Sequence, residues 1–352
     1  MTTTFDEPRA VAPWPESELE YLGRCPVCDH SGRTRIHEGL VDRLGSPGRW
    51  TLHRCDGCGS GYIDPRPTIG TISRLYANYY THDAPTQVGV SLPGRLRDAL
   101  FHGYLGERFG YRFAPAWRVG RAAVAAIPGA AGMASRRVRH LSRPRSEARL
   151  LDVGFGAGEF LRRMKGAGWI VEGIDPDPKA VERARRAGLD ARLGTLDSDD
   201  TPPDRYDAIT LSHSIEHMHD PAAVLRASFT ALRPGGVISI ATPNLEALGH
   251  QDFGRYWAAL DPPRHLVLFT RAALATALAR AGFERLSTPP TTLEAFGWTY
   301  RASEAIRVGA DPMLPPRMPA RLYPKAILAD LRTLTTRRYE EEIAIVAEKP
   351  KR

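Results

Sequence analysis

One stretch decides the fold of this chain: Leu151-Asp152-Val153-Gly154-Phe155-Gly156-Ala157-Gly158-Glu159-Phe160. The apolar residues before Gly154 predict a short buried strand, and Phe160, Leu161 and Met164 then recur at helical spacing. Glycines between a strand and a helix let the backbone approach a ligand closely, and the helix directs its first N–H groups toward the same place. The stretch therefore predicts a ligand site beyond the carboxyl end of a strand in an α/β sheet.

Strands and helices alternate from this stretch to the end of the chain. Asp177 is expected to cap a helix whose first residue is Pro178. Alternation of this kind predicts a parallel sheet covered by helices on both faces. The further segments expected are strands at 169–175, 206–212, 237–243, 282–288 and 341–350, and helices at 221–232 and 270–281.

The composition argues against several protein classes. No run of about 18 apolar residues occurs, so no membrane span is expected. Residues 1–10 lack the pattern of a signal peptide, which points to the cytoplasm. The net charge of +8 comes mostly from Arg and favours a soluble basic protein over a nucleic-acid-binding one. Four Cys in a chain of this length are too few for a disulfide-stabilised secreted protein.

A carboxylate at the end of the next strand strengthens the prediction of a bound ligand. Asp175 follows the glycine loop by about 20 residues, where a carboxylate can accept hydrogen bonds from ribose hydroxyls. Asp152 precedes G-x-G-x-G, not the G-x-G-x-x-G that binds pyrophosphate. S-adenosylmethionine carries a sulfonium and an amino group, and both favour a carboxylate over a phosphate cradle. A dinucleotide enzyme and a glycine turn without ligand are the alternatives.

These motifs resemble those of the class I, Rossmann-like S-adenosylmethionine-dependent methyltransferases. The resemblance covers roughly residues 148–290, and it includes Y-D-x-I-x-L at 206–211 and L-R-P-G-G at 232–236. It implies a seven-stranded, mostly parallel, doubly wound sheet. Phe155 stands where this family often has Cys or another small residue. The residues expected to bind the donor are Asp152, Gly154, Phe155, Gly156, Gly158, Asp175, Pro176, Thr195, Leu196 and Ser212.

Three imidazoles and a carboxylate lie in the turn after the strand at 206–212. Methyl transfer to oxygen needs a base for the acceptor hydroxyl, and His213 is the candidate because imidazole titrates near neutral pH. His213, Glu216 and His217 are the expected catalytic residues, and they could instead hold a divalent cation. Quinone-biosynthesis O-methyltransferases have Glu-x-x-Glu-His here, whereas this chain has His213 in place of the first Glu. Glu216 and His217 could also be a buried structural pair, and His219 belongs to the helix entry.

A long aromatic segment follows the strand at 237–243 and resembles a pattern of the methyltransferase type 23 subfamily. We expect it to form the acceptor pocket, with Trp257 stacking on a sugar or ring. Arg264 and His265 are expected to bind acceptor hydroxyls or a phosphate, although they could instead fix the turn.

Two C-x-x-C pairs supply four thiolates, Cys25, Cys28, Cys55 and Cys58. Two such pairs in one chain predict a tetrahedral structural zinc site more strongly than a redox dithiol. Four protein ligands leave no open position, so no catalysis is expected at this metal. The predicted organisation is a flexible tail at 1–20, a zinc-binding module at 21–80, a helical linker or cap at 81–147, and a Rossmann-like methyltransferase domain at 148–352 with an acceptor-side insertion at 244–268.

The function that the sequence favours is O-methylation of a small molecule, such as a sugar, glycolipid or secondary metabolite. An RNA methyltransferase with a zinc module is the second hypothesis, but the Asn-Pro-Pro-Tyr/Phe of base-amino methyltransferases is absent from the sequence after 212. A scaffold that binds the donor without catalysis is the third. The sequence does not reveal the acceptor or the oligomeric state.

Overall fold

The computed structural model describes residues 11–76, 92–198 and 201–351. Its centre is a seven-stranded sheet in the order β12-β13-β10-β9-β6-β7-β8. The strands β8, β7, β6, β9 and β10 pair in parallel, whereas β13 runs antiparallel to both of its neighbours. The expected mostly parallel sheet is thereby confirmed. The strands are β6 (Arg149–Val153), β7 (Ile170–Asp175), β8 (Asp190–Leu193), β9 (Tyr206–Ser212), β10 (Leu232–Pro243), β12 (Glu284–Ser287) and β13 (Glu342–Glu348).

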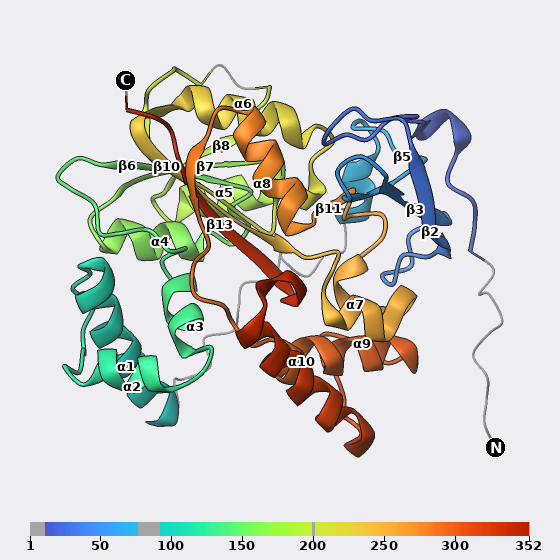
Figure 1. Ribbon diagram of the computed structural model, residues 1–352. Coiled ribbons are helices and arrows are strands. Elements are labelled where there is room, and N and C mark those ends of the chain that lie inside the picture. Colours follow the sequence, from blue (N-terminus) through green and yellow to red (C-terminus); the bar gives the residue numbers. More distant parts are fainter. Residues whose placement is uncertain (1–10, 77–91, 199–200, 352) are drawn as a thin grey trace.

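Helices cover both faces of this sheet (Figure 1). Successive side chains of a strand point to opposite faces, so Leu150 and Leu151 join different core clusters. Leu150 packs in the cluster that contains the buried residues of α4 (Glu159–Gly166) and α5 (Pro178–Arg186). Leu151 packs in the cluster of α6 (Pro221–Ala231) and α8 (Arg271–Arg280).

Capping residues set where the helices begin. The carboxylate of Asp177 accepts hydrogen bonds from the backbone N–H groups of Lys179 and Ala180, as the sequence predicted. Asp220 caps α6 through the N–H of Ala223. Each of these caps follows the carboxyl end of a strand, so the chain turns sharply at the edge where the ligand is expected.

A second, four-stranded antiparallel sheet lies at the N-terminal end of the chain, in the order β11-β4-β3-β2. Its strand β11 comes from the segment after β10, since Val267 pairs with Tyr62 of β4. The small sheet is thus completed by the larger domain, which the sequence did not indicate. Its strands are β2 (Arg33–Leu40), β3 (Trp50–Cys55), β4 (Gly61–Ile63) and β11 (Val267–Leu268), and β1 (Leu19–Glu20) pairs separately with β5 (Arg66–Pro67).

Two helical groups flank the lower edge of the large sheet in Figure 1. One group packs near α4 and consists of α1 (Leu92–Phe109), α2 (Gly120–Ala126) and α3 (Ala130–Arg136). The other group consists of α7 (Leu248–Phe253), α9 (Tyr300–Arg307) and α10 (Tyr323–Thr335). No helix within the described ranges has the length and apolar character to span a bilayer. Short turns of helix are η1 (Glu16–Glu18), η2 (Ile72–Tyr76), η4 (Ile215–His217), η5 (Gly254–Tyr256), η6 (Ala258–Leu260), η7 (Ala295–Thr299), η8 (Ala320–Leu322) and η9 (Arg337–Tyr339).

A buried ion-pair cluster ties the loop after β2 to the segment after β10. The Arg264 guanidinium donates at 2.6 Å to Asp42 and at 2.6 and 2.9 Å to Asp261. The Arg264 side chain is 1% exposed and that of Asp42 is not exposed at all. Although burial opposes its ionisation, the neighbouring Arg264 lowers the pKa of Asp261. The cluster satisfies charges that would otherwise lie unpaired between two segments far apart in sequence.

Replacing Arg264 with Ala is expected to lower the free energy of unfolding by about 3–5 kcal/mol, because the buried Asp42 loses its counter-ion. Urea unfolding checks this. The control is Arg233→Ala, which removes an exposed pair with Asp207 and is expected to cost at most about 1 kcal/mol. Equal losses for the two variants would show that the Arg264 cluster does not hold the two segments together.

Candidate active site

The glycine loop after β6 has the left-handed backbone that its glycines permit. Gly154, Gly156 and Gly158 have φ of 73°, 54° and 71°. A Cβ at Gly154 would lie 2.6 Å from the Cβ of Ser214, so only glycine allows this approach. The loop after β6 and the turn after β9 are therefore in direct contact.

Asp175 ends β7 beside this loop. Its two carboxylate oxygens accept hydrogen bonds from the backbone N–H groups of Gly156 and Asp177, both at 2.9 Å. Burial raises the pKa of Asp175. The carboxylate is thus fixed against the glycine loop, in the position expected for a group that binds ribose hydroxyls.

Asp152 has a partner that the sequence did not suggest. Its Oδ1 accepts hydrogen bonds from the guanidinium of Arg139 and, at 2.9 Å, from the hydroxyl of Thr210. The same guanidinium lies 3.8 Å from the centre of the Phe160 ring. Arg139 therefore neutralises the carboxylate that was expected to face the cationic groups of the donor. It lies in a stretch without periodic pattern, so no sequence signal marked it.

Phe155 turns into the core. Its ring lies against Gly173 of β7, where a Cβ would come within 2.5 Å of the ring. The side chain is 5% exposed. The absence of a side chain at Gly173 thus makes the room for a phenylalanine where the resembled family often has a small residue.

The other expected donor residues follow the ends of neighbouring strands. Pro176 is exposed after β7, and the Thr195 hydroxyl lies 2.7 Å from that of Ser198 after β8. Leu196 is buried in the core, and Ser212 is the half-buried last residue of β9. These residues share the carboxyl edge of the sheet with the glycine loop.

His213 is held between two glutamates. Its Nε2 lies 2.6 Å from Glu342 and its Nδ1 lies 3.5 Å from Glu216. Although burial opposes the charge, these carboxylates raise the pKa of His213 to about 10. The imidazole is therefore protonated at neutral pH. Glu342 begins β13 and was not recognised from the sequence.

His217 has the opposite character. Burial and the neighbouring His265 lower its pKa to about 4, so it is neutral at pH 7. Its Nδ1 lies 3.0 Å from the Arg264 carbonyl, to which it can donate, and 3.0 Å from the Tyr76 hydroxyl. This arrangement leaves Nε2 as the lone-pair nitrogen.

Glu216, His217 and His265 could hold a divalent cation, because their potential ligand atoms lie within 4.8 Å of one another. His265 resembles His217 in that its Nδ1 lies 2.8 Å from a backbone carbonyl, that of Ala259. Such contacts fix the tautomer of metal-binding histidines. Glu216 is fully buried, and its Oε1 makes no hydrogen bond within the described part of the chain. The donor set therefore fits a cation, with His265 in the place where the sequence had suggested His213.

A cavity of about 1230 Å³ opens beside the two histidines. Three chain segments line it: the loop between β2 and β3 at 39–47, the segment 255–265, and the segment 294–313. Arg264 and His265 line this cavity, and Arg264 forms ion pairs there with Asp42 and Asp261. Trp257 lies behind the wall, fully buried, and its indole N–H donates at 3.0 Å to Glu341.

The four cysteines form one cluster. Cys25 and Cys58 have their Sγ atoms 3.7 Å apart, and Cys28 and Cys55 have theirs 3.5 Å apart. No disulfide joins them. The backbone N–H groups of Val27 and Cys58 donate to the Sγ atoms of Cys25 and Cys55 at 3.4 and 3.5 Å. Cys55 ends β3, so the cluster lies at the opposite end of the β2–β3 hairpin from the cavity.

Part of this chain is similar in sequence to known methyltransferases. Residues 129–288 match the model of a family described as "Methyltransferase domain". The ubiquinone biosynthesis O-methyltransferase of Aeromonas salmonicida (strain A449) is 38% identical over 103 residues, which are 27% of this chain and 43% of that protein. That of Methylocella silvestris is 33% identical over 114 residues, or 31% of this chain and 44% of that protein.

The chain spans less than half the length of these curated relatives. Among solved structures, a SAM-dependent methyltransferase from Archaeoglobus fulgidus has 18% identity and a TM-score of 0.43, over 61% of this chain and 92% of that chain. The family match and the strand order, with β13 antiparallel beside β10, lead to one conclusion. Residues 129–288 of this chain match the methyltransferase domain family, and the chain carries the fold of the class I S-adenosylmethionine-dependent methyltransferases.

Proposed function

We propose that this protein transfers the methyl group of S-adenosylmethionine to an oxygen of a small molecule, such as a sugar, glycolipid or secondary metabolite. The observation that carries the proposal is the contact between Gly154 and Ser214. It places the expected donor loop against the turn that presents His213 and His217 to the cavity. The curated relatives named as O-methyltransferases support oxygen as the target.

The donor would lie across the carboxyl edge of the large sheet. Asp175 would accept hydrogen bonds from the ribose, and Thr195 and Leu196 would border the adenine. The glycines would let the backbone pass close to the methionyl part of the donor. Asp152 would not contact the donor through Oδ1, because that oxygen accepts a hydrogen bond from Arg139. It would instead hold Arg139 beside the glycine loop.

The acceptor hydroxyl must lose its proton as the methyl group arrives. The sulfonium donor is already activated, so the protein supplies alignment and a proton acceptor. His213 is protonated at neutral pH, so it must first give up its proton if it is to serve as the base. His217 is neutral and keeps a free Nε2, which makes it the readier acceptor of a proton. Glu216 holds His213 in place and keeps its charge balanced.

A divalent cation bound by Glu216, His217 and His265 would lower the pKa of a hydroxyl in this cavity. In that case His217 would be a ligand, and the proton of the acceptor hydroxyl would pass to solvent water in the cavity. His213 and Glu342 are not among these ligands. They line the cavity next to the cation site, where they can contact the acceptor.

The four thiolates would hold a structural zinc ion. Zn–S bonds of about 2.3 Å in a tetrahedron separate the sulfurs by about 3.8 Å, close to the contacts between the two cysteine pairs. We propose that zinc fixes one end of the β2–β3 hairpin, whose other end, at 40–47, forms a wall of the cavity. The metal would then shape the acceptor site from a distance, without touching the reaction.

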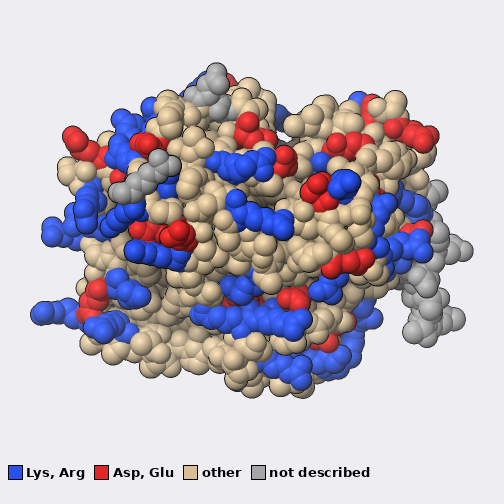
Figure 2. Space-filling model, turned by 45° about the horizontal axis from the view of Figure 1, so that its top comes forward, with Lys and Arg blue, Asp and Glu red and all other residues tan. Residues whose placement is uncertain are grey.

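The face of the molecule in Figure 2 gives less support to nucleic acid as the acceptor. On the face shown in Figure 2, Lys and Arg are interspersed with Asp and Glu. Mixed charges of this kind are typical of a solvated surface, whereas phosphate backbones are held by tracts of cations.

Incubation with methyl-labelled S-adenosylmethionine and fractionated extract of the source cells is expected to label a small-molecule or glycan fraction. The variants His213→Asn and His217→Asn are expected to lower the labelling about 100-fold, because each removes a polar group beside the reacting oxygen. His219→Asn is the matched control in the same turn, since its ring bonds the Pro67 carbonyl and does not line the cavity.

Label that disappears with ribonuclease would replace this proposal with RNA methylation. Donor binding without any labelled product in a complete set of fractions would favour the scaffold hypothesis. Full activity of His213→Asn would remove His213 as the base.

Elemental analysis is expected to find about one zinc per chain, and Cys28→Ser is expected to lose it. Hydrogen exchange in the variant should then quicken at residues 40–52, while residues 150–175 keep their protection, because the cluster anchors the hairpin and not the large sheet. Ser31→Ala, an exposed position close to Cys28, is the control. Retention of structure at 40–52 without metal would contradict the role of zinc.

A further inference from the structure

The helix α10 exposes its large apolar side chains. Tyr323, Ile327, Leu331 and Leu334 are 40%, 48%, 54% and 43% exposed. At 3.6 residues per turn they share an arc of about 80°. Leu328 borders this arc with 50% exposure, and Phe296 packs on Tyr323 with ring centres 5.7 Å apart. These six residues are called the apolar face below.

The inner side of α10 is built from small residues. Ala326, Ala329 and Thr333 are buried, and Asp330 accepts hydrogen bonds from the N–H groups of Ala295 and Phe296. A helix at the surface of a globular protein normally buries its large apolar residues and exposes polar ones. The reversed arrangement of α10 marks its outer side as a surface that contacts something other than water.

Cations concentrate around the apolar face. Residues 296–338 contain eight Lys and Arg against three Asp and Glu. Two of those three carboxylates, Glu304 and Asp330, are buried. The segment thus contributes +5 to the chain's net charge of +8, by eight minus three.

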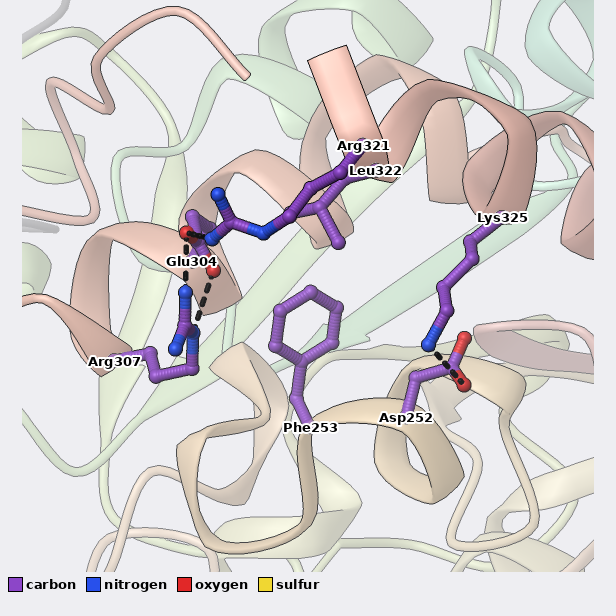
Figure 3. Close-up of a pocket in the computed structure, with 7 residues that line it drawn as sticks. All are labelled: Asp252, Phe253, Glu304, Arg307, Arg321, Leu322 and Lys325. Carbon is purple, nitrogen blue, oxygen red and sulfur yellow. Dashed lines mark hydrogen bonds and ion pairs between the residues drawn. The ribbon is translucent and has the colours of Figure 1, made fainter. Parts of the chain in front are cut away.

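Several of these cations form ion pairs that join neighbouring helices. Figure 3 shows Arg307 and Arg321 converging on Glu304, and Lys325 pairing with Asp252, with the Phe253 ring between the two groups. These pairs hold η8 and α10 against α9 and α7. They also line a small cavity of about 390 Å³, in which three cations face two carboxylates.

Arg317 and Arg332 differ from those residues. Both are exposed, and neither forms an ion pair with any carboxylate in the described ranges. Arg332 lies on the outer side of α10, beyond Leu328 on the helical wheel. Arg332 therefore borders the apolar face with positive charge, and Arg317 lies in the exposed stretch shortly before η8.

The acceptor cavity is lined in part by η7, which contacts α10. Trp298 and Met313 line that cavity and are themselves 45% and 45% exposed. Leu314, next to Met313, is 81% exposed. An exposed tryptophan, tyrosine and leucines with flanking arginines are the side chains that proteins place at a bilayer–water boundary.

We propose that the apolar face, with Arg317 and Arg332, docks on the surface of an anionic lipid bilayer. Leucine and aromatic side chains would enter the headgroup boundary, and the arginines would meet lipid phosphates. A second copy of the chain fits less well, because a two-fold contact through α10 would bring together two surfaces that both carry unpaired arginines. Given the function proposed above, docking there would set the cavity mouth at the bilayer, where an amphiphilic acceptor can enter.

Vesicle sedimentation with ligand-free protein tests docking without relying on methyl transfer. Vesicles of phosphatidylcholine with about 30% phosphatidylglycerol are expected to bind the protein, and pure phosphatidylcholine to bind it at least about tenfold more weakly. Ile327→Ser with Leu331→Ser, and separately Arg317→Glu with Arg332→Glu, should each weaken binding by about tenfold or more. These side chains are exposed, so the variants should keep the fold.

The control is Leu92→Ser with Leu96→Ser, which removes two leucines of 70% and 41% exposure from α1 with the same spacing. It should bind vesicles as the unaltered protein does. Failure of the unaltered protein to sediment with anionic vesicles would overturn the proposal. So would a dimer in solution that Ile327→Ser with Leu331→Ser converts to monomer, since a second copy would then cover the face. Neither result would bear on whether the protein transfers a methyl group, which the labelling experiment tests separately.

Discussion

The close approach of the Gly154 backbone to Ser214 is the constraint on which the rest of the site depends. Parallel strands β6 and β9 are neighbours, so their carboxyl ends meet at one edge of the sheet. A side chain at Gly154 would push the two loops apart. With glycine there, the loop that is expected to face the donor lies directly against the turn that carries His213 and His217. The charge arrangement of that turn, a protonated His213 and a neutral His217, then lies where the methyl group would be delivered.

The acceptor side is assembled from segments distant in sequence. The small sheet that contains the β2–β3 hairpin is completed by strand β11, which comes from the segment after β10. Arg264 of that segment forms an ion pair with Asp42 in the loop after β2. The cysteine cluster lies at one end of this hairpin and the cavity wall at the other. The buried ion pairs join this wall to the methyltransferase domain, and the proposed zinc site would fix the other end of the same hairpin.

The sequence predicted the elements that obey local rules. The glycine loop, the capping Asp177 and the mostly parallel sheet are visible in spacing and in hydrophobic period, and the structure contains them. The cysteine pairs predicted their own cluster because spacing brings such pairs together. Arg139, Glu342 and the His217–His265 contact were not foreseen, since each depends on how distant segments pack. The sequence likewise did not predict that Trp257 is buried and donates a hydrogen bond to Glu341, because burial depends on the whole fold.

The central claim is that the edge beside Asp175 binds S-adenosylmethionine. Calorimetric titration of the donor into the purified protein tests it most directly, with Asp175→Ala as the comparison and thermal unfolding to verify its fold. The account predicts one donor bound per chain and binding at least about tenfold weaker in the variant, because a charged acceptor of ribose hydrogen bonds is lost. Absence of donor binding to the unaltered protein, or equal affinity in a folded Asp175→Ala variant, would contradict it.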